Sequence, residues 1–410
     1  MHLREAPRRR PGSSEVRART RRSRALREGD GRRRGRRPSP LHESQLRIYL
    51  RPGPSAPRGA VAQPRMWGQR VAATRGADRR IVEPRVLQTS LAGRPSPPSI
   101  RPFERRDSEE SAGLLFLLSP AAVQTADSLV HRQVSEPERA LRRSWVAIEG
   151  GHLVGFATAY FQWFGGEAGK GRIWVGVRAE SRRRGVGSAL WSTAVAHLGG
   201  ARKHTVEVDD DPAGLAFVEH RGFTQYDAEV ISRLDPADCG LESKPHEGFR
   251  VVSLREVHEC AGELFEFYGK AGGIPPGDLQ NRVTLEEWRR AILANPILDL
   301  DASAVVLDRE QQIVSLSWLL VDPVRRRAEN EWTAMLPRLR GRGLARLAKL
   351  ASIRSAAERQ ITEIVTGTDP DNLPMRELNR RLGYCELFVR RDFERAPGIE
   401  DAGQRTLSRP

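Results

Sequence analysis

Two segments of the chain, 158 residues apart, carry the same loop pattern, Arg-x-x-Gly-x-Gly/Ala. The first is Arg182–Gly187 and the second is Arg340–Ala345. Each segment follows a run of β-forming residues and precedes a run with apolar residues at helical spacing. A glycine-aromatic pair about forty residues further on repeats as well, as Gly222-Phe223 and Gly383-Tyr384. Such a repeat predicts two copies of one supersecondary unit in tandem.

Hydrophobic periodicity predicts the same order of elements in both copies. In the first copy the expected strands are 145–148, 153–160, 172–177 and 205–208, and the expected helices are 185–198 and 213–220. In the second copy the expected strands are 304–307, 313–320, 329–336 and 361–366, and the expected helices are 343–357 and 373–381. We therefore predict an α+β fold with two mixed-sheet domains in tandem. The expected domains are 99–238 and 249–395, with a linker at 239–248 and a loose C-terminal tail at 396–410.

The first hundred residues differ in composition from the rest. They hold 25 Arg, no Lys and 7 acidic residues, and 12 of the 27 prolines precede residue 99. Because such a segment cannot bury enough apolar surface to offset its ordering entropy, we predict that residues 1–98 form a disordered, Arg-rich tail. Residues 101–410 hold 43 basic and 45 acidic residues, so nucleic acid is not an expected partner of this part. A tail that tethers the chain to nucleic acid stays an alternative.

Cysteine spacing and apolar runs exclude several classes of protein. Cys239, Cys260 and Cys385 have neither paired nor metal-like spacing, which excludes a disulfide scaffold and a zinc ribbon, and we expect no metal. The longest apolar run, 112–123, is too short to span a bilayer, and the Arg-rich start lacks the apolar region of a signal peptide. We therefore predict a cytoplasmic protein with no membrane partner. Its oligomeric state stays open.

The repeated loop has the chemistry of an anion site. It leads from a strand into a helix N-terminus, where unpaired backbone N–H groups and the helix dipole favour negative charge. Gly185 and Gly187 allow close approach of a bulky anion to the backbone, as does Gly343 in the second copy. The arginines add charge-assisted hydrogen bonds. The alternative is a tight strand-to-helix turn with solvated arginines.

The order of strand, loop, helix, strand and short helix ending in Gly-Phe/Tyr resembles the GNAT superfamily of N-acetyltransferases. The tandem arrangement is also found in mycothiol synthase. The resemblance implies acetyl-CoA as co-substrate, with its pyrophosphate on each loop and its pantetheine arm along the preceding strand. In the first copy the implied coenzyme-binding residues are Val175, Val177, Arg182, Arg183, Arg184, Gly185, Val186, Gly187 and Ser188. In the second copy they are Thr333, Met335, Arg340, Gly341, Arg342, Gly343, Leu344, Ala345 and Asn372.

The positions implied for proton transfer depart from the family pattern. Many members carry Tyr four residues before the final Gly, where it protonates the leaving thiolate. Those positions are Val218 and Asn379 here. Asn379 can hydrogen-bond a sulfur or an amide but is not a general acid. A base must accept the proton of the amine, and Glu331 lies two residues before Thr333, on the same strand face by period-2 alternation. In the first copy, Glu207 on the following strand is the nearest equivalent acid.

The sequence therefore predicts an acetyl-CoA-dependent N-acetyltransferase that acts on a small-molecule amine. The amine would attack the thioester directly, with Glu331 and Asn379 as the catalytic residues. Two alternatives stay open. One is a non-catalytic acyl-CoA-binding or sensor protein. The other is a nucleic-acid-associated protein acetyltransferase tethered by the basic tail.

Overall fold

The computed structural model describes residues 98–164, 169–240, 246–272 and 283–398. The predicted disordered tail lies outside the described residues, apart from its last residue. The same holds for residues 241–245 of the expected linker and 399–410 of the expected C-terminal tail. Within the described ranges, no helix is long and apolar enough to cross a membrane.

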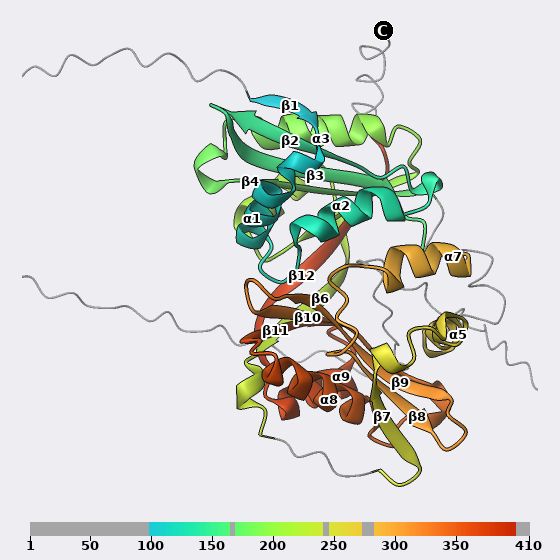
Figure 1. Cartoon of the computed structure of the whole chain (residues 1–410). Helices are drawn as coiled ribbons and strands as arrows, with labels where there is room; N and C mark the ends of the chain where they lie inside the picture. The colour runs from blue at the N-terminus through green and yellow to red at the C-terminus, as the bar shows by residue number, and fades with distance from the viewer. Residues whose placement is uncertain (1–97, 165–168, 241–245, 273–282, 399–410) are drawn as a thin grey trace, which may run out of the picture. The chain divides into compact units, whose positions relative to one another are not determined.

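The two copies of the repeat build one kind of unit twice, as the sequence predicts (Figure 1). The strands of the first copy are β1 (Ser99–Pro102), β2 (Arg143–Glu149), β3 (His152–Phe161), β4 (Lys170–Val177), β5 (Lys203–Val208) and β6 (Thr224–Leu234). Its helices are α1 (Ser108–Leu118), α2 (Ala126–Ser135), α3 (Val186–His197) and α4 (Pro212–Glu219). The strands of the second copy are β7 (Phe249–Ser253), β8 (Ala304–Asp308), β9 (Ile313–Asp322), β10 (Arg327–Met335), β11 (Glu363–Thr368) and β12 (Cys385–Arg395). Its helices are α5 (Ala261–Ala271), α7 (Leu285–Trp288), α8 (Leu344–Glu358) and α9 (Leu373–Leu382).

All these strands join a single twelve-stranded sheet, because the two copies exchange their last strands. The strand order is β1-β2-β3-β4-β5-β12-β6-β11-β10-β9-β8-β7. Strand β12 of the second copy pairs antiparallel with β5 of the first, and β6 of the first pairs antiparallel with β11 of the second. In Figure 1, β6 and β12 run side by side between the two sets of helices. The expected α+β tandem is confirmed, while the division into domains at 238 and 249 stays a prediction.

The helix behind each loop supplies the core of its copy. Helix α3 packs on β3 and β4, and α8 packs on β8, β9 and β10. Their buried faces carry the apolar residues that the 3.6-residue period predicts. These residues are Val186, Leu190 and Leu198 in the first copy and Leu344, Leu347 and Leu350 in the second.

Buried ion pairs connect β12 of the second copy to the first copy. Arg390 of β12 is fully buried, and its Nε lies 2.6 Å from Asp209 Oδ1 and 3.2 Å from Glu207 Oε1. Arg172 of β4 pairs with Glu207 at 2.6 Å and with Asp392 of β12 at 3.2 Å. Burial alone would lower the pKa of Arg390, but these carboxylates outweigh it and raise that pKa well above its ordinary value. The network therefore holds charges from both copies in one buried cluster.

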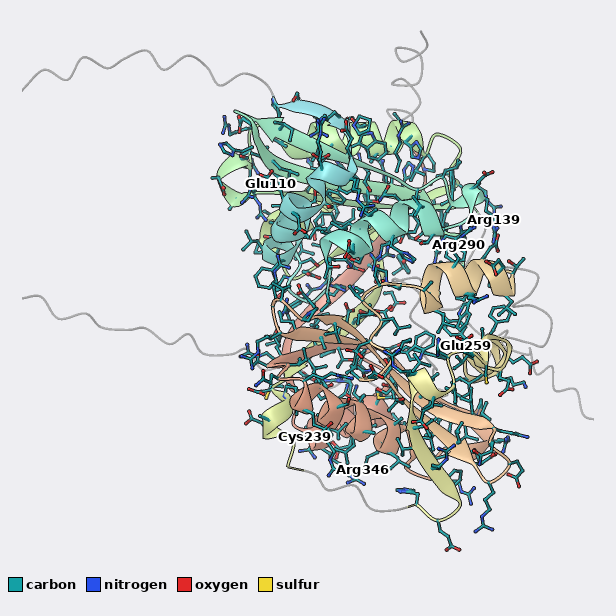
Figure 2. All side chains as sticks on the ribbon, in the orientation of Figure 1. Glu110, Arg139, Cys239, Glu259, Arg290 and Arg346 are labelled. Carbon is teal, nitrogen blue, oxygen red and sulfur yellow. The ribbon has the colours of Figure 1, made fainter. Side chains whose placement is uncertain are left out.

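The two copies also meet where the end of α2 faces α7. The guanidinium of Arg290 donates to the backbone carbonyl of Ser135 at 2.7 Å, and Arg139 forms an ion pair with Glu287. Figure 2 labels Arg139 and Arg290 on facing elements in this region. The pair with Arg139 holds the pKa of Glu287 at about 2. The first copy thus closes one side of the space in front of β10.

Candidate active site

A cleft opens in the second copy where two parallel strands diverge. Strands β10 and β11 pair only over Arg327–Glu329 and Glu363–Val365. Beyond that point β10 stays paired with β9, and β11 stays paired with β6. A cavity of about 690 Å³ lies there, lined by β10, the Arg340–Ala345 loop, the start of α8, β11 and α9. Seven of the residues predicted to bind the coenzyme line it: Thr333, Met335, Arg340, Gly341, Gly343, Ala345 and Asn372.

The loop at one end of this cleft has the backbone of an anion site. Gly341 and Gly343 have φ values of 79° and 74°, in the left-handed region that favours glycine. Helix α8 begins directly after Gly343 and has no side-chain cap, so its first N–H groups are left for a ligand. Among the described residues, Arg340 has no carboxylate partner within ion-pair distance. Leu344 is buried in the core, and the Arg342 guanidinium lies 5.7 Å from the centre of the Phe249 ring.

Glu331 lies at a β-bulge that the sequence did not predict. The register of β10 against β9 shifts between Asn330 and Trp332, which leaves Glu331 as the extra residue. Strict alternation therefore fails here, and it cannot place Glu331 on the face of Thr333. The hydroxyl of Thr333 donates to Asn330 Oδ1 at 2.9 Å and lies 3.3 Å from Ser317 Oγ, which is hydrogen-bonded to Ser352 of α8. Glu329 is buried, and its carboxylate accepts a hydrogen bond from the Val123 backbone at 3.0 Å.

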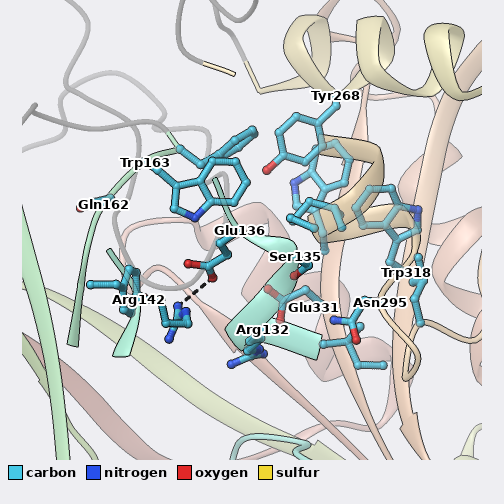
Figure 3. A pocket seen from close by; sticks show the side chains of 17 residues that line it. Arg132, Ser135, Glu136, Arg142, Gln162, Trp163, Tyr268, Asn295, Trp318 and Glu331 are labelled. Atoms are coloured by element: carbon cyan, nitrogen blue, oxygen red, sulfur yellow. Dashed lines mark ion pairs between the residues drawn. The ribbon is translucent and has the colours of Figure 1, made fainter. Parts of the chain in front are cut away.

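A second, smaller cavity of about 90 Å³ lies against the same bulge, and residues from both copies line it (Figure 3). The second copy contributes the aromatic side chains of Tyr268, Trp318 and Trp332 together with Glu331. The first copy contributes Arg132, Ser135, Glu136, Arg142, Tyr160, Gln162, Trp163 and Phe164. Figure 3 shows Glu331 and Arg132 on one side of it, with Trp163 and Tyr268 on the other. Glu331 lines both this cavity and the cleft.

Charges around the small cavity are balanced and largely buried. The ion pair between Arg142 and Glu136 measures 2.8 Å, and the Arg142 guanidinium lies 3.7 Å from the centre of the Tyr160 ring. Burial and the neighbouring Arg142 lower the pKa of Arg132, against the opposite pull of Glu136 and Glu331. Burial and the Glu331 carboxylate raise the pKa of Tyr268 well above its ordinary value. Sequence analysis did not single out Arg132 or Glu136, because α2 was not predicted.

Comparison with known proteins agrees with this geometry. The model of the acetyltransferase (GNAT) family matches residues 116–223 and again residues 265–384. The chain belongs to the GNAT family of acetyltransferases.

Similar proteins include two curated relatives and two solved structures, one of which is described as a tandem GNAT protein. A mycothiol acetyltransferase of Nocardioides sp. is 24% identical over 225 residues, which are 51% of this chain and 74% of that protein. One from Clavibacter sepedonicus is 26% identical over 230 residues, or 52% of this chain and 69% of that protein. Among solved structures, a tandem GNAT protein from the clavulanic acid biosynthesis pathway superposes with a TM-score of 0.58 at 20% identity. The superposition covers 73% of this chain and 99% of that chain. A GNAT from Sphaerobacter thermophilus gives a TM-score of 0.54 at 14% identity and covers 74% and 98% of the two chains.

The GNAT loop of the first copy is less suited to an anion. Arg183 occupies the position of Gly341 and has a φ of 61°, a conformation that costs a non-glycine residue about 1 kcal/mol. Arg182 pairs with Asp211 at 3.3 Å, and Arg184 pairs with Glu149 at 2.5 Å. These arginines are thus already neutralised by carboxylates of their own copy. Val177 and Val186 are buried in the core, Val175 packs against it, and Ser188 accepts a hydrogen bond from Arg221 at 3.0 Å. Gly185 has a φ of 87°, and Gly187 lies in the first turn of α3.

The positions at the GNAT tyrosine also differ between the copies. Val218 is buried in the apolar core of the first copy. Asn379 is buried in the second, and its amide donates to Thr368 Oγ1 at 3.0 Å. Asn372 caps α9 by accepting from the Met375 backbone at 3.3 Å. Glu207, the alternative base, is held in ion pairs with Arg172 and Arg390. In the described part of the chain, no cluster of three His, Cys, Asp or Glu side chains could hold a metal ion.

Proposed function

We propose that this GNAT transfers the acetyl group of acetyl-CoA to a small-molecule amine, with the donor in the cleft of the second copy and the acceptor in the small cavity. The observation that carries the proposal is the position of Glu331, which lines both spaces. A carboxylate between donor and acceptor is where a base for the attacking amine is needed. The names of the mycothiol acetyltransferase relatives support an acceptor of low molecular weight.

The donor would bind by its negative end and its extended arm. The N–H groups at the start of α8 and the Arg340 guanidinium would take the pyrophosphate. The arm would lie along Thr333–Met335, where β10 has lost its partner β11. Backbone N–H groups freed by that divergence would polarise the thioester carbonyl and stabilise the charge that develops on its oxygen. The roles of Thr333, Met335, Arg340, Gly341, Gly343, Ala345 and Asn372 are part of this proposal.

The first copy would line the acceptor cavity and would not bind a second molecule of the donor. Two of its three loop arginines, Arg182 and Arg184, are paired with Asp211 and Glu149, and Arg172 and Glu207 belong to the buried ion network. Its contribution is α2 and the end of β3, which supply Arg132, Glu136 and Trp163 to the acceptor cavity. We therefore propose one turnover site per chain.

Paired substitutions in the two loops test this division. Gly343→Asp places a negative charge at the start of α8 and should weaken acetyl-CoA binding about a hundredfold or more. Gly185→Asp makes the same change at a residue with a similar φ in the first copy, and we expect affinity close to that of the natural protein. Calorimetric titration with acetyl-CoA measures the affinity of both variants. Unchanged affinity in Gly343→Asp would refute the donor site, and loss only in Gly185→Asp would move it to the first copy.

One observation favours a second function, a non-catalytic acyl-CoA-binding protein. Asn379 stands where many GNATs carry a proton donor and cannot release a proton itself. Release of free thiol from acetyl-CoA, followed with a panel of small amines, separates the two. Tight donor binding without thiol release for any amine would favour the binding protein.

A further inference from the structure

Lys349 is a buried ionisable residue of the cleft to which the proposed function assigns no role. Lys349 lies on α8, six residues after Gly343, which corresponds to a rise of about 9 Å along the helix axis. The residue is among those that line the cleft, and it is 1% exposed. Its Nζ lies 4.8 Å from the centre of the Tyr384 ring. No carboxylate among the described residues lies within ion-pair distance of it.

Because it is buried, the Lys349 amine is present in both its neutral and its protonated form near pH 7. Loss of hydration lowers the pKa of Lys349 from its ordinary 10.5 to about 7, and no charged neighbour contributes to the shift. The titratable group that faces it is Tyr384, whose own pKa is raised by burial. At neutral pH, Lys349 can therefore both hold and release a proton.

The other ionisable groups along the cleft are unsuited to this task. Glu377 is bound to Arg380 and Arg381, which hold its pKa at about 2. Arg340, Arg346 and Arg381 are guanidinium groups, which do not give up a proton in proteins. Glu331 is already assigned to the acceptor side. Tyr384 belongs to the buried apolar cluster that includes Leu382 and Leu234, and it does not line the cleft.

On the basis of the proposed function, we propose that Lys349 is the proton donor to the sulfur of the departing coenzyme A. The amine nitrogen bonds to the thioester carbon, and Glu331 takes the proton that the nitrogen loses, directly or through water. The C–S bond then breaks, and its electron pair leaves with the sulfur. The Lys349 ammonium transfers one proton to that sulfur and becomes a neutral amine. Exchange with solvent returns both groups to their starting states.

Binding of two coenzyme analogues tests the contact without knowledge of the acceptor. Coenzyme A and desulfo-coenzyme A differ by the sulfur atom alone, so the ratio of their dissociation constants reports what the protein does at the sulfur. At pH 7, close to the pKa of Lys349, we expect the natural chain to bind coenzyme A roughly tenfold more tightly, because the ammonium form stabilises a thiolate. Lys349→Met should bring this ratio near one. Arg346→Met, which removes a charge one helical turn earlier in the same cleft, should keep it.

A titration of the natural chain gives a second readout that needs no variant. Ultraviolet absorbance of the thiolate measures the pKa of the bound thiol, which we expect at least one unit below that of free coenzyme A. Equal affinities for the two analogues, an unchanged ratio in Lys349→Met, or an unshifted thiol pKa would each overturn the role of Lys349. If the natural chain binds neither analogue, the proposed donor site itself is wrong.

Discussion

Substitution of Arg390 by Met tests whether the strand exchange binds the two copies into one cooperative unit. Arg390 lies on β12, while its partners Glu207 and Asp209 belong to β5 and the residue just after it. The change removes a fully buried guanidinium and leaves Asp209 without its partner at 2.6 Å. Glu207 keeps its ion pair with Arg172. Methionine replaces the apolar stem of the arginine side chain, so loss of the charge is the main effect.

The expected cost follows from burial. Removing one member of a buried ion pair typically costs about 3–5 kcal/mol, since the remaining charge stays desolvated. That is a large share of the roughly 5–15 kcal/mol by which folded domains are stable. The matched control is Arg391→Met on the next residue of the same strand. Arg391 pairs with Asp210 at 2.6 Å, but both side chains are partly exposed, so we expect less than about 1 kcal/mol.

Urea unfolding measures the loss of stability in both variants. Tryptophan fluorescence and far-ultraviolet circular dichroism should report one coincident transition, because β6 and β12 each complete the sheet of the other copy. Arg390→Met should move the whole transition to lower urea concentration, and Arg391→Met should barely move it. Two separated transitions in the natural chain would refute the coupling of the copies. Equal effects of the two substitutions would refute the buried network as its cause.

Three further changes test the site and the tail. Glu331→Gln should lower turnover by roughly a hundredfold or more while the calorimetric affinity for acetyl-CoA stays within a fewfold, and full activity would show that Glu331 is not the base. Between pH 7 and 10.5, Lys349 binds more protons in the unfolded chain than in the folded one. The free energy of unfolding measured in urea should therefore rise by about 2 kcal/mol from pH 7 to 9 because of this group. Lys349→Met should be more stable at pH 7 and lose this contribution, and an unchanged pH dependence would contradict the burial argument. A chain that starts at residue 98 should melt cooperatively and bind acetyl-CoA like the full chain, and loss of either would show that the tail has a structural role.

The sequence predicted the parts of the fold in which local pattern and burial agree. Strands β2–β4 and β8–β10, helices α3 and α8 and the repeated loop all lie close to their predicted positions. Strands β6 and β12 and helix α2 were not predicted. Strand β12 is central in the sheet, yet it carries Arg390 and Asp392 toward the interior, so it has no apolar alternation to detect. The partners of Arg390 and Asp392 include Arg172 of β4, Glu207 of β5 and Asp209 just after β5, all far away in the sequence.

The sequence predicted residues of the cleft proposed for the donor, but not the first-copy residues of the cavity proposed for the acceptor. Loop residues such as Arg340 and Gly343 follow from a local motif, and they do line the cleft. The bulge at Glu331 arises from the pairing of β10 with β9, and a period-2 argument cannot reveal it. Arg132 and Glu136 reach the acceptor cavity only because the first copy packs against the second.

The position of β12 between β5 and β6 also sets an order in which the chain can be completed during synthesis. Strand β5 ends at Val208, and its partner begins at Cys385, so the ribosome must add 177 residues before the native edge can close. At roughly 5–20 residues per second, this edge stays open for about 10–35 s. Strand β6 is made first and can pair with β5 in the meantime, as neighbouring strands often do. We therefore expect the nascent first copy to hold its own last strand provisionally and to release it when β11 and β12 emerge.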